Sequence, residues 1–251
     1  MSGGLTSTIR LFVTDPLAEG AALSLAAGQA HYLGTVMRRE AGQSVLVFNG
    51  RDGEWRARIT ALGRGRAALS VEAMTRPQPR PPDLWLLAPV LKRDTLAWMV
   101  EKATELGVSR ILFTTSARSA VPRANAERLA ATAVEAAEQC GRLDVPALEP
   151  AVPLAARLAA WPAGRHLLVG DATGTAPAAA SVIAASGPGA WAAAVGPEGG
   201  FTPGELDAFG KLPFCRRASL GPRTLRAETA AVAAVALLQA LAGDWRDHHL
   251  P

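Results

Sequence analysis

Apolar and polar residues alternate along the first third of the chain. Residues 54–62 and 67–74 place apolar side chains at every second position, and shorter apolar stretches cover 10–13, 21–25 and 44–50. A period of two indicates half-buried strands. Asn49-Gly50 is typical of a tight turn between two of them. The pattern predicts a small β-barrel.

Prolines interrupt this pattern at residues 75–83, "TRPQPRPPD", where four of the nine positions are proline. Proline neither donates to a strand ladder nor continues a helix, so this stretch is typical of a linker. We place a domain boundary here. Residues 1–76 are expected to form the barrel and residues 77–251 a second domain.

Beyond the linker, apolar runs alternate with segments of helical periodicity. The runs cover 84–90, 110–115, 165–171, 190–195 and 215–220, and the helical segments cover 94–106, 126–139 and about 224–242. Asp94 is the expected N-cap of the first helix, and Gly107 and Gly141 are expected to end the first two. Strands that alternate with helices predict an α/β fold with a mostly parallel sheet.

Charge is concentrated in one part of the chain. The formal net charge is +4, but residues 38–80 alone hold nine arginines and four acidic residues. A local basic field of this size suits a phosphate backbone. An arginine-rich solvated surface explains it equally well on charge alone.

The remaining composition argues against several classes of protein. Cys140 and Cys215 stand in no ligand spacing, so neither a disulfide framework nor a zinc site is expected. The N-terminus lacks the apolar segment of a secretory signal, and the alanine-rich stretch near residue 230 begins with charged Arg226 and Glu228. We therefore expect a cytoplasmic protein with no membrane span and no metal.

Two glycine-proline loops follow predicted strands and lead into predicted helices. In "VGPEGGFTPGE", residues 195–205, Thr202 and Glu205 form a capping-box pattern with Pro203 at the first helical position. "LGPRTLRAETA", residues 220–230, repeats the design. Both loops lack the phosphate-binding loop pattern, and neither carries the dinucleotide fingerprint. They are either two walls of one pocket or two ordinary turns, and spacing does not decide between them.

A polar stripe lies on the second predicted helix. Glu135, Glu138, Gln139 and Arg142 occur at helical spacing and so share one face. By itself this pattern indicates a solvated surface.

Five motifs occur together in one order along the chain: "EKATELGV", "SARS", "EAAEQCGR", "VGPEGGFTPGE" and "LGPRTLRAETA". With them, the sequence resembles the bacterial 16S ribosomal RNA uridine-N3 methyltransferases of the SPOUT, or α/β-knot, superfamily. The stretch "AHYLGTVMRREAGQSVLVFNG", residues 30–50, is similar to the PUA-like RNA-binding barrel of that family. The resemblance implies a C-terminal trefoil-knot domain, bound S-adenosylmethionine and a homodimer.

The resemblance also implies roles for individual residues. Catalytic roles fall on Arg226, with Glu198 or Glu228 as proton acceptor or orienting group. The expected donor-binding residues are Gly170, Val195, Gly196, Pro197, Glu198, Gly199, Gly200, Leu220, Gly221, Leu225 and Arg226. The expected contacts to substrate RNA in the small ribosomal subunit are Arg38, Arg39, Arg118, Glu135, Gln139 and Arg142.

Three alternative functions stay open on the sequence. A ribose 2'-O methyltransferase would share the fold, a non-catalytic RNA-binding or assembly factor would keep the fold without the reaction, and a small-molecule methyltransferase would not need the basic barrel.

Overall fold

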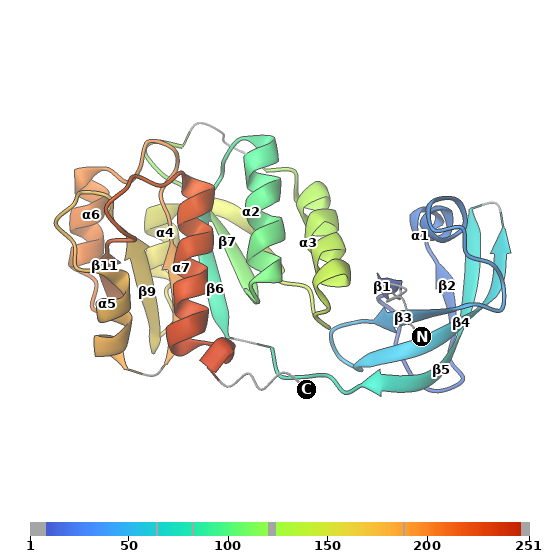
Figure 1. Cartoon of the computed structure of the whole chain (residues 1–251). Coiled ribbons are helices and arrows are strands. Elements are labelled where there is room, and N and C mark those ends of the chain that lie inside the picture. The colour runs from blue at the N-terminus through green and yellow to red at the C-terminus, as the bar shows by residue number, and fades with distance from the viewer. Residues whose placement is uncertain (1–8, 64, 82, 120–123, 188, 247–251) are drawn as a thin grey trace. The chain divides into compact units, whose positions relative to one another are not determined.

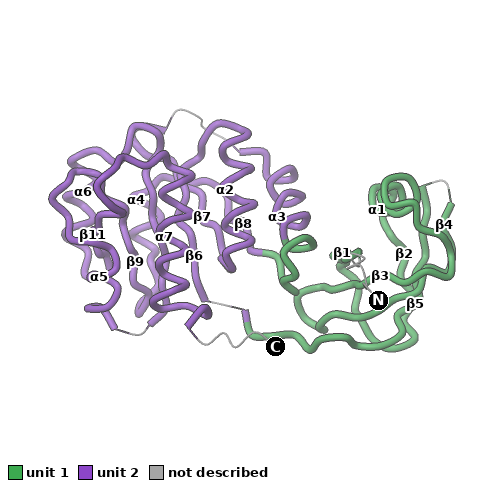
Figure 2. The backbone as a smooth tube through the Cα atoms, viewed as in Figure 1, with its two compact units in different colours: residues 1–80, 137–145 green, residues 81–136, 146–251 purple. Residues whose placement is uncertain are grey.

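A computed structural model describes residues 9–63, 65–81, 83–119, 124–187 and 189–246. The chain forms two compact units (Figure 2). Unit 1 comprises residues 1–80 together with 137–145, and unit 2 comprises 81–136 and 146–251. The ends of the expected domains, residues 1–8 and 247–251, lie outside the described residues.

Unit 1 is built on a five-stranded sheet in the order β1-β3-β4-β5-β2. β1 pairs parallel with β3, and the other pairs are antiparallel. Alternate residues such as Val45, Ala57, Ile59 and Leu69 are buried in its core, as the period of two predicted. The strands are β1 (Arg10–Phe12), β2 (Ala22–Leu25), β3 (Ser44–Phe48), β4 (Glu54–Gly63) and β5 (Arg66–Arg76).

Unit 1 also contains helical turns that the strand pattern did not predict. The short helix α1 (Ala27–His31) continues into a π-helical segment, η1 (Tyr32–Val36). Gly34 lies over the β4–β5 hairpin, because a Cβ added there would be 3.6 Å from a methyl carbon of Leu62. Arg38, two residues beyond η1, has a φ of 49°, which is uncommon for a residue with a side chain.

A buried carboxylate joins β1, β4 and β5 in unit 1. The side chain of Glu54 is 4% exposed and accepts hydrogen bonds from Arg10, Arg76 and Thr75. Arg10 also donates to the carbonyl oxygens of Ala137 and Glu138, at 2.9 and 3.0 Å. These carbonyls close the last turn of α3 (Ala126–Cys140), where a cation is favourable.

The segment 137–145 therefore contributes to unit 1 although it follows the proline stretch by more than fifty residues. Ala137 and Leu143 form a small apolar cluster with Phe48, against which Phe12 and Val145 pack.

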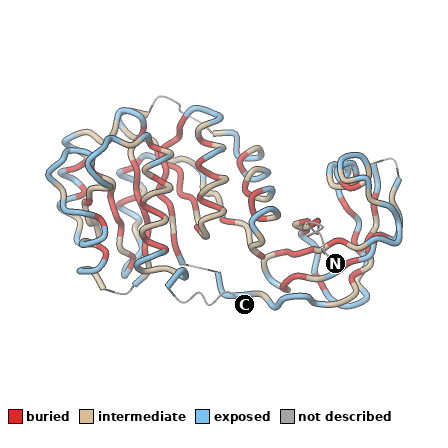
Figure 3. Tube along the Cα trace, in the orientation of Figure 1, coloured by how far each residue is buried: buried red, intermediate tan, exposed pale blue. Residues whose placement is uncertain are grey.

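Unit 2 is built on a six-stranded sheet in the order β11-β9-β10-β6-β7-β8, with all neighbours parallel. The predicted parallel sheet is confirmed. The strands are β6 (Leu84–Pro89), β7 (Arg110–Thr115), β8 (Ala147–Pro153), β9 (Arg165–Gly170), β10 (Ala190–Ala194) and β11 (Cys215–Ala218). Figure 3 shows that the buried residues of this unit follow its strands and the inner sides of its helices.

Helices cover the sheet of unit 2. α7 (Ala227–Ala242) packs against α2 (Arg93–Glu105), α5 (Ala179–Ser186) and β10, and it lies in front of the sheet in Figure 1. α4 (Leu154–Ala159) and α6 (Pro203–Gly210) contribute to one apolar cluster with the side chains of Leu87, Leu167 and Val169. None of the described helices is long and apolar enough to cross a membrane.

Several local expectations need correction. Asp94 is not the N-cap of α2. That position is Lys92, which makes no side-chain cap bond, and the 91% exposed carboxylate of Asp94 pairs with Arg128 instead. The last helix begins at Ala227 rather than near Thr224, so the loop before it is longer than expected.

β8, α4 and α5 were not predicted from the sequence pattern. β8 contains Pro150 and Pro153, and it forms the edge of the sheet, where proline costs no ladder bond on the open side. α4 has only six residues, and α5 is rich in alanine without a clear polar face.

Candidate active site

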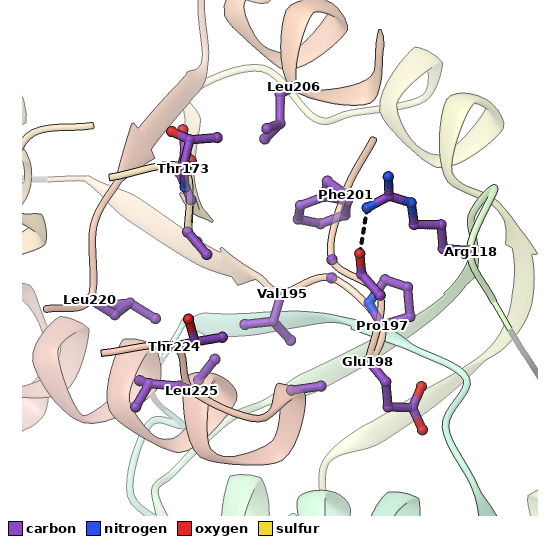
Figure 4. A pocket seen from close by; sticks show the side chains of 18 of the residues that line it. Arg118, Thr173, Val195, Pro197, Glu198, Phe201, Leu206, Leu220, Thr224 and Leu225 are labelled. Atoms are coloured by element: carbon purple, nitrogen blue, oxygen red, sulfur yellow. Dashed lines mark hydrogen bonds between the residues drawn. The ribbon is translucent and has the colours of Figure 1, made fainter. Parts of the chain in front are cut away.

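A cavity of about 360 Å³ opens at the carboxyl ends of β9, β10 and β11 (Figure 4). Parallel sheets bind ligands at this end of their strands. Four segments of unit 2 and Leu206 line the cavity. They are Arg118 after β7, residues 170–173 at the end of β9, residues 195–201 after β10, and, after β11, residues 220–221 and 223–225 with Ala227 and Ala230. The two glycine-proline loops thus form walls of one pocket.

The first wall is a tight turn in the loop that follows β10. The amide of Gly200 donates to the carbonyl oxygen of Pro197 at 2.8 Å, and Gly200 has a φ of +68°. A Cβ added to Gly196 would lie 2.9 Å from the amide nitrogen of Phe201. The loop is so closely folded at Gly196 that a side chain there would displace backbone.

The capping box predicted at the start of α6 is confirmed. The Thr202 hydroxyl accepts the amide of Glu205 at 3.2 Å, and the Glu205 carboxylate accepts the amide of Thr202 at 2.7 Å. Pro203 occupies the first helical position. Phe201 and Leu206, on either side of the capping box, both belong to one apolar cluster of unit 2. α6 therefore begins directly after the loop that forms the first wall.

The second wall is the loop between β11 and α7. Ser219 pairs with the segment before α5, because its amide donates to Pro177 at 2.8 Å and its carbonyl oxygen accepts from Ala179 at 3.0 Å. Leu220 also approaches the end of β9. A Cβ added to Gly170 would be 3.6 Å from a methyl carbon of Leu220. In Figure 4, Val195, Leu220 and Leu225 surround the same space.

Asp171 lines the cavity and was not singled out from the sequence. Its side chain is fully buried, accepts from the Arg217 guanidinium at 2.7 and 2.9 Å, and accepts from the amide of Thr173 at 2.8 Å. Burial by itself would raise the pKa of Asp171, but the hydrogen bonds from Thr173 and Arg217 outweigh it and lower the pKa. An acidic residue directly after an apolar run was the only sequence signal for this role.

Two arginines reach the cavity lining. Arg118 donates from Nη1 to the carbonyl oxygen of Gly199, as the dashed line in Figure 4 shows. It was expected to contact RNA, and here it also forms part of the cavity wall. Arg223 lines the same cavity and is exposed, although its place in the "LGPR" motif did not lead us to expect a role for it.

The three expected catalytic residues are placed differently. Glu198 lines the cavity, and its side chain is exposed and extends away from Val195 (Figure 4). Arg226 is exposed and caps α7 with its backbone, and Glu228 lies in the first turn of that helix. Among the described residues, the cavity lining includes neither Arg226 nor Glu228. Every other expected donor-binding residue lines it: Gly170, Val195, Gly196, Pro197, Gly199, Gly200, Leu220, Gly221 and Leu225.

The expected RNA-contacting residues divide between the two units. Arg38 is exposed and Arg39 partly exposed in unit 1. Glu135 and Gln139 are exposed on α3. The side chain of Arg142 is only 10% exposed and pairs with Asp144 at 2.7 Å, so this arginine is bound within unit 1.

The described cysteines and acidic residues offer no grouping of three that could hold a metal ion. Cys140 is exposed, and burial raises the pKa of the Cys215 thiol to about 12. Cys215 therefore stays protonated at neutral pH, whereas the thiolate is the form that reacts as a nucleophile.

Two family models match successive parts of the chain. An RNA methyltransferase PUA domain matches residues 25–72, and an RNA methyltransferase domain matches residues 78–239. Among curated relatives, a ribosomal RNA small subunit methyltransferase E from Rickettsia conorii is 30% identical, and the match covers 92% of this chain and 95% of that protein.

Solved structures agree with these matches. A ribosomal RNA small subunit methyltransferase E from Neisseria gonorrhoeae, bound to S-adenosylmethionine, superposes with a TM-score of 0.85 at 29% identity, covering 95% of this chain and 99% of that one. A Legionella pneumophila methyltransferase with the same cofactor gives a TM-score of 0.85 at 27% identity, with coverages of 94% and 99%. The chain therefore belongs to the RNA methyltransferase family that includes the ribosomal RNA small subunit methyltransferase E proteins.

Proposed function

We propose that this protein is an S-adenosylmethionine-dependent methyltransferase that methylates N3 of a specific uridine in 16S ribosomal RNA of the small ribosomal subunit. The observation that carries this proposal is the cavity formed by the two glycine-proline loops. Relatives that superpose over nearly the whole chain are solved with S-adenosylmethionine bound. The uridine N3 position comes from the resemblance of the five motifs.

The residues of the cavity fit such a donor. A volume of about 360 Å³ lies in the range of small-molecule sites, which combine apolar walls with a few polar groups. Val195, Phe201, Leu220 and Leu225 supply apolar surface for an adenosine ring. The glycines of residues 196–200 leave backbone amides and carbonyls accessible for the polar parts of the ligand. Bound there, the sulfonium supplies an activated methyl group for displacement.

The protein's own task is to position and activate the uracil. Loss of the N3 proton leaves negative charge on the two carbonyl oxygens, which arginine donors stabilise. We assign this role to Arg226, supported by Arg118 and Arg223 at the cavity lining. Glu198 or Glu228 accepts the proton or orients an arginine. Little further chemistry is required, because positioning provides much of the rate in such displacements.

The remaining parts of the proposal concern RNA and assembly. Arg38 and Arg39 of the PUA-like unit contact the RNA backbone, and Glu135 and Gln139 of α3 lie toward the substrate or a subunit interface. We further propose a homodimer in the cytoplasm and a knotted path of the chain through the loops after β9 and β11. The pairing of Ser219 with the segment before α5 supports the last point, because it brings these two loops together.

The experiment that tests the function is transfer of labelled methyl groups from S-adenosylmethionine to unmodified small ribosomal subunits, followed by digestion and mass spectrometry of the nucleosides. We expect 3-methyluridine. A 2'-O-methylated nucleoside would instead establish the ribose methyltransferase. Absence of both transfer and donor binding would support the assembly factor.

The proposed contact of unit 1 with RNA needs a separate test. Replacing Arg38 and Arg39 with alanine should weaken RNA binding and reduce its dependence on salt concentration, because fewer counterions are released. An unchanged salt slope would place the RNA elsewhere.

A further inference from the structure

Two loops that are about 80 residues apart in sequence are joined by a pair of hydrogen bonds beside the cavity. The amide of Ala117 donates to Oε1 of Glu205 at 3.1 Å. One residue further along, Arg118 donates to the carbonyl oxygen of Gly199. The loop after β7 is thus tied both to the first turn of α6 and to the turn that forms the first cavity wall.

Glu205 makes more bonds than helix capping requires. Its Oε2 atom accepts the amide and the hydroxyl of Thr202, at 2.7 and 3.0 Å, which completes the capping box. Its Oε1 atom is left for Ala117. Burial alone would raise the pKa of Glu205, but the bonds from Thr202 and Ala117 and the nearby charge of Arg118 outweigh it and lower the pKa. The side chain is therefore an ionised double acceptor at neutral pH.

Arg118 packs directly on the cavity wall. A Cβ added to Gly199 would lie 3.1 Å from Cδ and 3.3 Å from Cβ of Arg118. The aliphatic stem of Arg118 therefore covers Gly199, while its guanidinium holds the carbonyl of the same residue. Holding an arginine in one conformation costs both side-chain and backbone entropy. A backbone that is already anchored at Arg118 lowers this cost and so favours the contact with Gly199.

We propose that Glu205 is a positioning residue for the donor cavity. By accepting the amide of Ala117, it fixes the backbone at Arg118, and Arg118 in turn holds the turn of residues 197–200 in its binding conformation. Glu205 does not line the cavity itself and acts through Arg118. The inference rests on the proposed function, because it takes S-adenosylmethionine as the ligand of the cavity.

Two variants separate this role from simple helix capping. In Glu205→Gln, the single carbonyl oxygen can complete the capping bond to Thr202, but the amide group then presents a donor to the Ala117 amide. Thr202→Ala is the matched control, because it removes the capping hydroxyl and leaves both carboxylate oxygens of Glu205 in place. Thr202→Ala loses the N-cap hydroxyl and is therefore expected to lower the unfolding temperature slightly.

The measurement is the dissociation constant of S-adenosylmethionine by isothermal titration calorimetry, on the full chain. We expect Glu205→Gln to weaken binding by roughly three- to tenfold, the effect of losing one hydrogen bond to a charged acceptor. Thr202→Ala should change binding by less than about twofold, because its effect is confined to the helix end. In the donor-free protein, hydrogen exchange of amides in residues 195–201 should accelerate in Glu205→Gln but not in Thr202→Ala.

A double-mutant cycle tests whether the effect passes through Arg118. In an Arg118→Ala background, Glu205→Gln should cause no further loss of donor affinity, because the connection is already broken. Additive losses would refute the proposed route. Equal weakening by Glu205→Gln and Thr202→Ala would show that capping alone matters. If the unmodified protein fails to bind S-adenosylmethionine, the proposed function fails, which is a different outcome from either of these.

Discussion

The buried carboxylate of Glu54 should make the stability of unit 1 depend on pH in a defined window. Burial alone would raise the pKa of Glu54, but hydrogen bonds from Arg76, Arg10 and Thr75 lower it from 4.5 to about 2. One pKa unit corresponds to 1.36 kcal/mol, so the ionised group contributes about 3 kcal/mol to the free energy of unfolding. A lowered pKa means that this contribution is fully present above about pH 4.5 and is lost as the pH falls toward 2.

The substitution Glu54→Gln removes the charge with little change in shape. At pH 7 it should destabilise unit 1 by about 3 kcal/mol, because Arg10, with a side chain only 10% exposed, is left without its counter-charge. The difference between the two proteins should shrink as the pH falls from 4.5 toward 2. Urea unfolding at a series of pH values, monitored by hydrogen exchange in peptides from β3 to β5, measures this for unit 1 alone.

Glu72 provides a matched control within the same sheet. It pairs with Arg56 and Arg58, whose side chains are about half exposed, so solvent screens these ion pairs. Glu72→Gln should leave the pH dependence nearly unchanged. The reasoning would be refuted if Glu54→Gln kept the slope of the unmodified protein between pH 4.5 and 2, or if the two variants behaved alike.

Three further substitutions test other parts of the structure. Gly199→Ala places a methyl group against the aliphatic stem of Arg118 and should weaken S-adenosylmethionine binding, measured by calorimetry. Gly204→Ala, at an open position in α6, is the control and should leave the affinity unchanged. Equal affinities of the two variants would mean that the Arg118 side chain moves away freely. Leu143→Ala removes a side chain that is 3% exposed and should destabilise unit 1 by roughly 2–5 kcal/mol. Amide hydrogen exchange should then be faster in β3 of unit 1 and unchanged in β9 of unit 2. Arg226→Ala should abolish methyl transfer and spare donor binding, and unchanged turnover in the transfer assay would remove this residue from the mechanism.

Local signals located the cavity, but its detailed membership depended on contacts between distant segments. The two glycine-proline loops were recognised because glycine, proline and capping residues act on their immediate neighbours. Arg223 lies within one of these loops, but only the fold shows that it reaches the cavity, and Asp171 lies outside both loops. Asp171 is defined by its partner Arg217 on another strand, and this pairing exists only because β9 and β11 are neighbours in the sheet.

Features that arise within a few residues could be predicted from the amino-acid sequence alone. The alternation in β4 and β5, the helical periodicity of α2 and the Thr202–Glu205 capping box all depend on local geometry, so their residue patterns are readable directly. Contacts between segments that are distant in the sequence arise only in the folded chain. It placed Leu143 in the core of unit 1, and it brought Ala117 to the second oxygen of Glu205. These contacts depend on the folding of segments tens of residues apart, and no local pattern encodes the partner of a buried side chain.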